Sequence, residues 1–337
     1  MTVTISVALC TRNGASHLEQ QLASIFAQTL LPDEIVVSDD ASSDETVPIV
    51  RAAFDGAAGR RRPRLLLIQN PEPLGVTANF EQALRSCSSE LIALCDQDDA
   101  WHENRLSAAV EVLDARPEID LLYSDARLVD ANGEPLGYSL FEALDVSPAE
   151  REAVSSGSGL GALLRRNLVT GATTIVRREL VQRAVPFPAP WVHDEWLAVV
   201  AATSGGLTFL AEQLIDYRQH GTNEIGVRKL NFMGRVNRVL EPRDGRNAYL
   251  LERSRVLLAR LEQMGGEVST KDLELVRGKV EHLRFRSTLQ SRRVKRWRPV
   301  LREVATGRYA LFGRGTGDIL RDLFQPAGVS EGNDVTS

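Results

Sequence analysis

The chain of 337 residues carries 40 Lys and Arg against 45 Asp and Glu, a net charge of −5, and apolar residues make up 43% of it. This composition is that of a globular protein, and no stretch approaches the roughly 18 consecutive apolar residues of a membrane span, so disorder and membrane crossing are not expected. The cysteines, Cys10, Cys87 and Cys95, match neither a disulfide framework nor a zinc motif, and we expect them to be reduced core residues of a cytoplasmic protein.

The charge is divided unevenly along the chain. Residues 1–227 hold 17 Arg and no Lys against 32 acidic residues, whereas residues 228–326 hold 23 basic residues against 11 acidic ones. A change of composition this abrupt indicates a domain boundary near Val227. We therefore expect a first domain over 1–227, a basic α-helical region over 228–326 and a disordered tail over 327–337.

Strands and helices alternate over the first hundred residues. Apolar runs and helical spacing predict strands at 4–10, 34–38, 64–69 and 91–95, and helices at 15–28, from 45 onward and at 75–87. This alternation indicates an α/β fold, in which helices cover both faces of a mostly parallel, Rossmann-like sheet.

After residue 100 the pattern loosens, which predicts that the sheet becomes mixed. We expect a helix at 101–115, a strand at 120–123, a hairpin at 132–133, a loop at 155–161 and a strand at 171–176. A helix at 194–202, strands at 207–210 and 214–217, and long helices at 249–264 and 271–289 follow.

Two of the predicted strands end in acidic residues. The second strand runs into Asp39 and Asp40, and the fourth runs into the segment Asp96–Asp99, which has three carboxylates within four residues. Because the C-terminal ends of parallel strands meet at one edge, these side chains should face one crevice. Carboxylates this close repel one another unless a cation joins them, and oxygen ligands suit Mg2+ or Mn2+. The alternative is a solvated acidic turn before the next helix.

The sequence lacks the phosphate-binding loops of two classes of nucleotide-dependent enzyme. No Gly-x-Gly-x-x-Gly follows the first strand, and residues 1–227 contain no Lys that could serve a P-loop. This argues against a dinucleotide-dependent dehydrogenase and against a P-loop NTPase. A diphosphate would instead be neutralised by a metal ion at the acidic cluster, which would make it a better leaving group.

Three segments, Ile5–Asn13, Ile35–Asp44 and Asp96–Asp99, resemble in their order the successive motifs of inverting glycosyltransferase family 2. The likeness covers about residues 4–222 and implies a GT-A fold, a single Rossmann-like domain with a mixed sheet that uses a nucleoside-diphosphate sugar. The segments His193–Trp196 and Tyr217–Asn223 are similar to the bacterial rhamnosyltransferase-like branch, which implies rhamnose and a dTDP or UDP carrier.

The resemblance implies which residues hold the donor and the metal. The donor side comprises Thr11, Arg12, Asn13, Asp39, Asp40, Asn79, Asp96, Gln97 and Arg218, with Asp40 at the base and Asn79 near the diphosphate or sugar. The metal side comprises Asp98, Asp99 and His220. Alone, His220 would more often be an ordinary histidine, but Arg218 and Asn223 beside it favour a diphosphate site.

Asp194 matches the position of the catalytic base in the family. That base takes a proton from the acceptor hydroxyl as it attacks the anomeric carbon from the face opposite the leaving diphosphate. The alternative is that Asp194 or Glu195 only charges the N-terminus of the following helix. Glu195 stands where an aromatic residue is commoner in this branch, so it could share the role of the base or take it over.

These features predict a metal-dependent inverting glycosyltransferase that acts on a glycan or lipid-linked saccharide. A sugar-phosphate nucleotidyltransferase, and a catalytically silent sugar-binding or scaffold protein, are the alternatives. The basic stretch at 290–325 predicts peripheral contact with the inner face of the cell membrane, a partner or homo-oligomer interface, or merely a solvated helical face. Nucleic-acid binding is not expected, because no known binding module and too few stacking aromatics are present.

Overall fold

The computed structural model describes residues 3–55, 62–219 and 245–326. The chain divides into two compact units, residues 1–162 with 167–228 and residues 163–166 with 229–337. The boundary near Val227 and the tail from residue 327, which the sequence predicts, lie outside the described residues and remain predictions.

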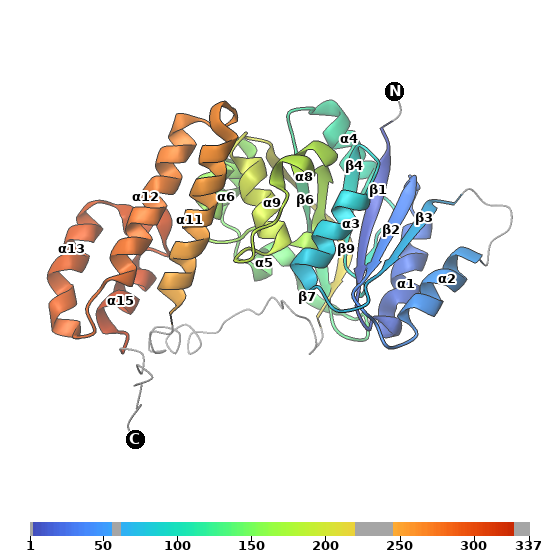
Figure 1. The fold of residues 1–337 in the computed structure, drawn as a ribbon, viewed down its shortest axis with the longest axis horizontal. Helices are drawn as coiled ribbons and strands as arrows, with labels where there is room; N and C mark the ends of the chain where they lie inside the picture. Colours follow the sequence, from blue (N-terminus) through green and yellow to red (C-terminus); the bar gives the residue numbers. More distant parts are fainter. Residues whose placement is uncertain (1–2, 56–61, 220–244, 327–337) are drawn as a thin grey trace, which may run out of the picture. The chain divides into compact units, whose positions relative to one another are not determined.

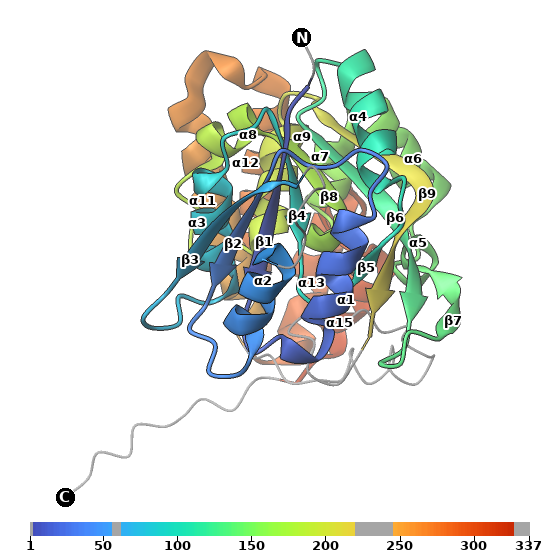
Figure 2. The ribbon, with the colours of Figure 1, turned by 90° about the vertical axis from the view of Figure 1, so that its right-hand side faces the viewer.

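The first unit is built on one nine-stranded sheet (Figures 1 and 2). The order of the strands is β3-β2-β1-β4-β8-β6-β9-β5, and β7 pairs with β6. The strands are β1 Ile5–Thr11, β2 Glu34–Asp39, β3 Arg64–Gln69, β4 Leu91–Cys95, β5 Ala100–Trp101, β6 Leu121–Val129, β7 Pro135–Ser139, β8 Thr174–Arg177 and β9 Leu207–Arg218. The longer helices are α1 Ala15–Phe26, α2 Thr46–Asp55, α3 Val76–Ser86, α4 Arg105–Ala115, α6 Pro148–Ser155, α8 Arg178–Ala184 and α9 His193–Ala202. The short ones are α5 Leu140–Ala143, α7 Gly159–Leu163 and the 3-10 turn η1 Gly171–Thr173.

The directions of the strands bring several strand ends to one edge of the sheet. Strands β1 to β4 are mutually parallel. Strand β8 is antiparallel to both β4 and β6, and β9 is parallel to β6, so β6 and β9 run in the direction of β4. The C-terminal ends of β1, β2, β4 and β9 therefore meet at one edge, and β8 begins there. The predicted mixed, mostly parallel sheet is confirmed.

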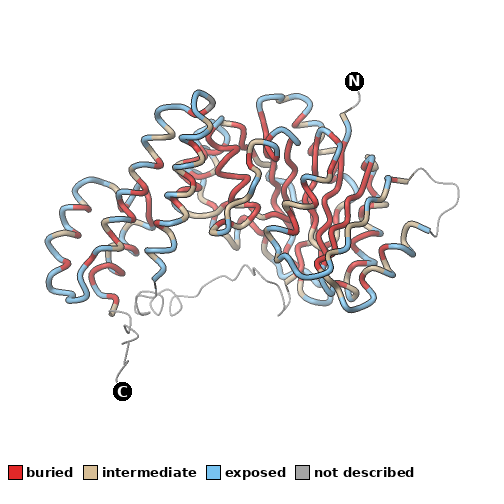
Figure 3. The backbone as a smooth tube through the Cα atoms, viewed as in Figure 1, coloured by how far each residue is buried: buried red, intermediate tan, exposed pale blue. Residues whose placement is uncertain are grey.

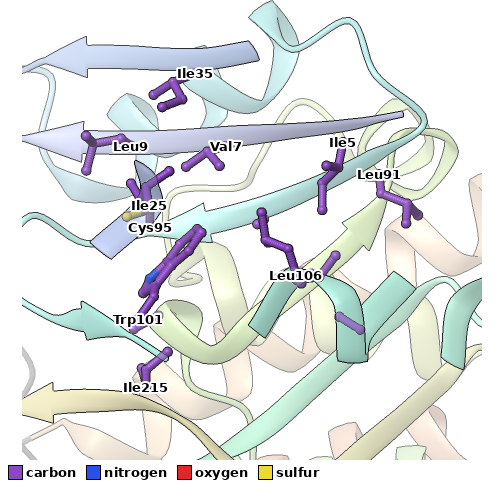
Figure 4. Packing of buried hydrophobic residues seen from close by; sticks show 14 of the residues in the cluster. Ile5, Val7, Leu9, Ile25, Ile35, Leu91, Cys95, Trp101, Leu106 and Ile215 are labelled. Atoms are coloured by element: carbon purple, nitrogen blue, oxygen red, sulfur yellow. The ribbon is translucent and has the colours of Figure 1, made fainter. Parts of the chain in front are cut away.

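Apolar side chains on one face of the sheet form the main core (Figure 4). Ile5, Val7 and Leu9 alternate along β1 and pack with α1, α2 and α4, as is expected where every second residue of a strand faces the same layer. Helix α3 packs against β1 and β2, and Figure 2 shows it on the face opposite α1 and α2. The central strands are buried on both faces (Figure 3), which explains their continuous apolar sequences.

Three predictions of local structure were wrong. The loop expected at 155–161 is limited to residues 156–158, because α6 extends to Ser155 and α7 starts at Gly159. The two strands expected between 207 and 217 are one strand, β9, since shifts in its register with β6 accommodate the exposed residues at 211–213. The helix expected from Trp101 begins only at Arg105, because Ala100 and Trp101 pair with β9 as β5.

The second unit is helical, as the sequence predicts. Its helices are α11 Arg246–Met264, α12 Thr270–Ser287, α13 Trp297–Ala305, α14 Arg308–Phe312 and α15 Thr316–Phe324, with 3-10 turns η2 Gly265–Glu267 and η3 Arg293–Arg296. Two small apolar clusters hold it together, one around Leu251 and Leu283 and the other around Val300 and Leu323. Across the described ranges of both units, no helix is sufficiently long and apolar to span a membrane.

Candidate active site

The loops that follow β1 and β2 are tied to each other at the edge of the sheet. Thr11 Oγ1 donates to Asp39 Oδ1 over 2.8 Å. The N–H of Asn13 donates to Ser42 Oγ at 2.8 Å, and Asn13 Oδ1 accepts from the N–H of Ser43 at 2.9 Å. Thr11, Asn13 and Asp39, three of the residues predicted on the donor side, therefore belong to one rigid corner.

This corner also holds strained backbone. Asn13 and Ala41 have φ angles of 48° and 59°, and they are two of the three non-glycine residues with positive φ in the described parts of the chain. A side chain in the left-handed region costs on the order of 1–3 kcal/mol and persists only where neighbouring bonds impose it. The hydrogen bonds of Asn13 supply such a restraint at the first of the two positions.

Asp40 and Asn79 are buried, and their hydrogen bonds hold α3 and the residues just before it against the end of β2. The carboxylate of Asp40 accepts from the N–H groups of Leu74 at 2.6 Å and Gly75 at 2.9 Å. Asn79 exchanges two hydrogen bonds with Ser38 at 2.7 and 2.9 Å. Both side chains thus lie at the predicted edge, but these bonds join parts of the chain to each other. Contact of Asp40 with a base, or of Asn79 with a sugar, remains a prediction.

Gln97 joins the acidic segment after β4 to the loop after β1. Its Oε1 accepts from the N–H of Arg12 at 2.8 Å, and its Nε2 donates to the carbonyl of Arg12 at 3.0 Å. Gly14 leaves room for this pair, because a Cβ at that position would lie 2.1 Å from Gln97 Oε1. Arg12 and Gln97, both predicted on the donor side, are therefore paired through the backbone of Arg12.

Asp99 is the most buried carboxylate of the acidic segment. Its Oδ1 accepts from the N–H of Arg218 at 3.0 Å, while its Oδ2 is buried without a hydrogen-bond partner. Burial, and then the charges of Asp98 and Asp96, raise the pKa of Asp99 well above its usual value. A cation beside these carboxylates would relieve both the repulsion and the cost of burial. The chemistry of carboxylate oxygens thus suits a divalent ion at this segment.

The described residues do not by themselves form a complete metal site. Within them, no group of three or more His, Cys, Asp or Glu side chains is placed to hold a metal ion. His220, predicted as a ligand, lies outside the described residues. Any ion at Asp98 and Asp99 would therefore need further ligands beyond the described side chains.

Arg218, at the end of β9, is buried and bound to the chain's own oxygens. Its Nε donates to the carbonyl of Asp98 at 2.8 Å, its Nη1 to the carbonyl of Ala131 at 3.0 Å and its Nη2 to Gln20 Oε1 at 2.9 Å. Arg218 therefore fixes the backbone of the acidic segment. Its predicted contact with a diphosphate remains a prediction.

Arg105, which no sequence pattern singled out, lies in the core near the acidic segment. Its Nη2 donates to the carbonyls of Ala172 at 2.7 Å and Leu94 at 3.2 Å, and its guanidinium lies 3.8 Å from the ring centre of Trp101. Burial lowers the pKa of Arg105 to about 10, although Cys95, Asp99 and Asp96 act in the opposite direction. Arg105 therefore links the end of β4 to η1. A single arginine at the start of a predicted helix gives no signal of this role.

Asp194 lies in the first turn of α9 with both carboxylate oxygens bound. Its Oδ2 accepts from the N–H of Gly171 at 2.9 Å, and its Oδ1 accepts from the N–H of Glu195 at 2.6 Å. Gly171 belongs to η1, at the edge where β8 begins, so η1 carries Asp194 to the same edge as the acidic segment. The bond to Glu195 also shows that Asp194 interacts with the start of its own helix, as its alternative role requires. Glu195 is partly exposed beside it.

His193, next to Asp194, is buried in an apolar setting. Its ring stacks on Phe80 with 3.9 Å between the ring centres and 15° between the planes. Neither ring nitrogen has a hydrogen-bond partner, and burial lowers the pKa of His193 to about 3. A Cβ on Gly171 would lie 2.8 Å from His193 Nε2, so these residues approach closely. The stacking of His193 on Phe80 and its close approach to Gly171 fix the backbone position of the adjacent Asp194.

Two buried side chains show that the separate acidic residues share one region. Cys10 and Tyr217 are both largely buried, and burial is the main cause of their raised pKa values. Nearby charges raise them further: for Cys10 these include Asp96 and Asp40, and for Tyr217 they are Asp99, Asp96, Asp98 and Asp194. The ends of β2 and β4 and the start of α9 therefore contribute carboxylates near the buried ends of β1 and β9.

Comparison with known sequences identifies a family. Residues 6–167 match the family described as Glycosyl transferase family 2. The Escherichia coli protein named UDP-Glc:alpha-D-GlcNAc-diphosphoundecaprenol beta-1,3-glucosyltransferase WfgD is 24% identical over 202 residues, which cover 58% of this chain and 69% of that protein. An uncharacterized protein of Mycobacterium tuberculosis is 28% identical over 228 residues, 64% of this chain and 59% of that protein. The match thus spans about three fifths of the length of such mycobacterial relatives.

Comparison with solved structures concerns the fold. S. aureus TarS in complex with UDP-GlcNAc matches with a TM-score of 0.56 and 17% identity, covering 84% of this chain and 73% of that one. The mannosyltransferase PcManGT from Pyrobaculum calidifontis, in complex with GDP-Man and Mn2+, matches with a TM-score of 0.52 and 19% identity, covering 92% and 79%. These similarities confirm the expected GT-A fold.

Proposed function

The chain belongs to glycosyltransferase family 2, and from this premise we propose that it transfers a sugar from a nucleoside diphosphate to an acceptor hydroxyl with inversion at the anomeric carbon. One observation carries the proposal: Asp194 binds the N–H of Gly171 in η1, and Arg105 joins η1 to the end of β4, from which Asp96, Asp98 and Asp99 follow. A donor site and a base are needed at one place for this reaction, and these residues supply carboxylates for both.

The donor half is proposed at the ends of β1, β2 and β4. Thr11, Arg12 and Asn13 form the corner for the base and ribose, with Asp39 and Asp40 bracing it. Asn79 and Gln97 hold α3 and the acidic segment in place around that corner.

Asp98 and Asp99 are the proposed metal ligands, with His220 as a further one. Mg2+ is commonly held by one or two carboxylates together with the phosphates of a substrate. An ion held in this way would supply charge to the leaving diphosphate. The Mn2+ named in the PcManGT complex supports a divalent ion of this kind.

Asp194 is the proposed base. Two backbone N–H groups, from Gly171 and Glu195, fix the direction of its carboxylate, and each oxygen keeps a further lone pair to accept the proton of an acceptor hydroxyl. Arg105 positions this half of the site, because it binds both the carbonyl of Ala172 in η1 and the carbonyl of Leu94 at the end of β4.

For the substrates, we propose rhamnose or another hexose carried on dTDP or UDP, and a saccharide acceptor linked to a glycan or a lipid diphosphate. The similarity of His193–Trp196 and Tyr217–Asn223 to rhamnosyltransferase-like proteins supports the first. The lipid-linked acceptor in the printed name of WfgD supports the second.

The test is hydrolysis and transfer from dTDP-rhamnose, UDP-glucose and UDP-N-acetylglucosamine with Mn2+. Wild type, Asp98→Ala and Asp194→Asn are compared with Asp114→Asn, an exposed acid of α4, as the control. We expect turnover in wild type and control, and a loss of about 10²-fold or more in Asp194→Asn. Equal rates in all four proteins would eliminate the proposal. Release of pyrophosphate from a nucleoside triphosphate and a sugar phosphate would instead indicate a nucleotidyltransferase.

A further inference from the structure

We infer that the helical unit carries a docking surface for an anionic lipid bilayer. This surface, here called the basic apolar surface, comprises the apolar residues Val294, Trp297, Leu301, Leu320 and Phe324 and the cations Arg292, Arg293, Lys295, Arg298 and Arg302. The inference rests on this unit alone, so it holds or fails independently of the proposed glycosyl transfer.

The apolar part of the surface is strongly exposed. Val294 is 85% exposed, Leu301 56% and Trp297 45%. Leu320 and Phe324 on α15 are 42% and 41% exposed. In the described chain, six of the eleven large hydrophobic residues that are exposed fall between 294 and 324. Exposed apolar residues gathered in this way mark binding surfaces, whereas isolated ones do not.

A contact between two helices joins four of these residues, Trp297, Leu301, Leu320 and Phe324. Trp297 and Leu301 are one turn apart on α13, as are Leu320 and Phe324 on α15, so each pair lies on one helix face. The rings of Trp297 and Phe324 meet edge to face, with 6.0 Å between their centres. The two apolar stripes therefore join across the pair of helices.

The exposed charges of this region are all positive. Residues 288–325 contain nine Arg and Lys and three acids, Glu303, Asp318 and Asp322. All three acids are buried: Glu303 Oε1 lies 2.8 Å from His282 Nδ1, and Asp318 and Asp322 accept from Arg286. By contrast, Arg292, Arg293, Lys295, Arg298 and Arg302 are exposed. Folding thus removes the negative charges from the surface and leaves apolar and cationic groups on it.

A bilayer of anionic lipids matches this combination. Cations close to the surface are attracted to anionic headgroups, while Trp, Leu and Phe enter the boundary between headgroups and acyl chains. Trp is suited to that boundary because its ring is apolar and its N–H is polar. A second copy of the chain is a poorer occupant, because two cationic surfaces would repel each other.

The experiment is flotation of the full chain with vesicles of phosphatidylcholine alone or with 30% phosphatidylglycerol. Three variants are compared with wild type. Arg298→Glu/Arg302→Glu changes the charge of the surface, and Trp297→Ser/Leu301→Ser removes its apolar part. Arg255→Glu/Lys271→Glu is the matched control, since it makes the same change of charge at exposed positions of α11 and α12. Circular dichroism and the melting temperature establish that each variant is folded.

We expect wild type and the control to float with anionic vesicles and not with phosphatidylcholine alone, and 0.5 M NaCl to reduce the bound fraction. Each cation near the surface contributes a severalfold gain in partition, so Arg298→Glu/Arg302→Glu should lower it about tenfold or more. Trp297→Ser/Leu301→Ser should also bind more weakly. No flotation of wild type, or an equal loss in the control, would overturn the inference. Wild type could instead self-associate or bind RNA, with only the surface variants losing that interaction. That result would overturn the inference and assign the surface to the chain itself or to RNA.

Discussion

At the scale of single residues, Asp194 is held by two backbone N–H groups, and Glu195 is its partly exposed neighbour. If Asp194 is the base, Asp194→Asn keeps an oxygen for Gly171 but cannot take a proton. We expect kcat to fall by about 10²–10⁴-fold, with the KM of the donor nearly unchanged, and Glu195→Gln to cost less than about tenfold. Steady-state kinetics with a donor and an acceptor would measure this. The reverse ranking would assign the base to Glu195.

His193 should make the stability of the protein sensitive to pH. Its pKa is lowered to about 3 by burial, whereas a histidine in the unfolded chain titrates near 6.5. The contribution of the neutral His193 ring to the free energy of unfolding is therefore complete above pH 6.5. It is lost as the pH falls toward 3, because only the unfolded state binds the proton there.

The corresponding variant is His193→Phe, which keeps the stacking on Phe80 and removes the titration. Urea unfolding between pH 7.5 and 4.5 should show that wild type loses up to about 1.4 kcal/mol per pH unit relative to the variant. Parallel profiles of the two proteins would contradict the burial of a neutral imidazole at this position.

The sequence predicted the chemistry of single residues better than their partners. Asp96–Asp99 stands out because an apolar run ends in charge, and that pattern is local. The bonds of Asp40 to Leu74 and Gly75, and the position of Arg105 beside β4, depend on loops that the fold brings together. No periodic pattern in the sequence predicts those contacts. The residues with local signals were therefore found, and Arg105, which has none, was not.

At the scale of elements, the corner between the loops after β1 and β4 depends on the pairing of Gln97 with Arg12. Gly14→Ala should displace Gln97, because the new Cβ would meet Oε1 at 2.1 Å. We expect Gly14→Ala and Gln97→Ala to weaken the binding of a nucleoside diphosphate to a similar degree. The double variant should be no worse than Gln97→Ala alone, because both changes remove the same pair.

Gly206→Ala is the matched control for this cycle. Its new Cβ would lie 2.6 Å from Asp120 Oδ2, which accepts a hydrogen bond from Arg183. Gly206 and Asp120 precede β9 and β6, so they lie at the opposite edge of the sheet from the candidate site. This variant should lower the melting temperature and leave the dissociation constant of the nucleotide unchanged. Additive losses from Gly14→Ala and Gln97→Ala would show that the two residues act separately.

Elements with a clear period were predictable, and those defined by pairing were not. The strands β1, β2 and β4 are buried on both faces, and their continuous apolar sequences identify them. Strand β5 has only two residues, Ala100 and Trp101, and exists because β9 lies beside it. For the same reason β9 continues through an exposed interruption at 211–213, since β6 supplies its partner.

At the scale of the whole molecule, each unit has a core of its own, and the helical unit relies on a buried charge network. Arg286 binds Asp318 and Asp322, and Tyr309 donates to Asp322 Oδ2 at 2.7 Å. Arg286→Met would leave two buried carboxylates without their cation, at a cost of about 3–5 kcal/mol.

Hydrogen exchange followed by mass spectrometry would locate the effect. We expect faster exchange in α12 and α15 of Arg286→Met and unchanged exchange in β1 and β4. Arg284→Met, at an exposed position of the same helix, is the control. Slow exchange retained in α12 and α15 would show that the network contributes little to the stability of this unit.

The proposed reaction requires the carboxylates at the edge of the sheet to bind a nucleoside diphosphate together with a divalent ion. The most direct measurement is the melting temperature of wild type and Asp98→Ala with UDP, dTDP and GDP, each with and without Mn2+. Because a ligand of the folded state stabilises it by mass action, we predict a rise of several degrees in wild type that requires both nucleotide and Mn2+, and no such rise in Asp98→Ala. Equal shifts in both proteins, or shifts that do not depend on Mn2+, would show that these carboxylates do not bind a nucleotide through a metal ion.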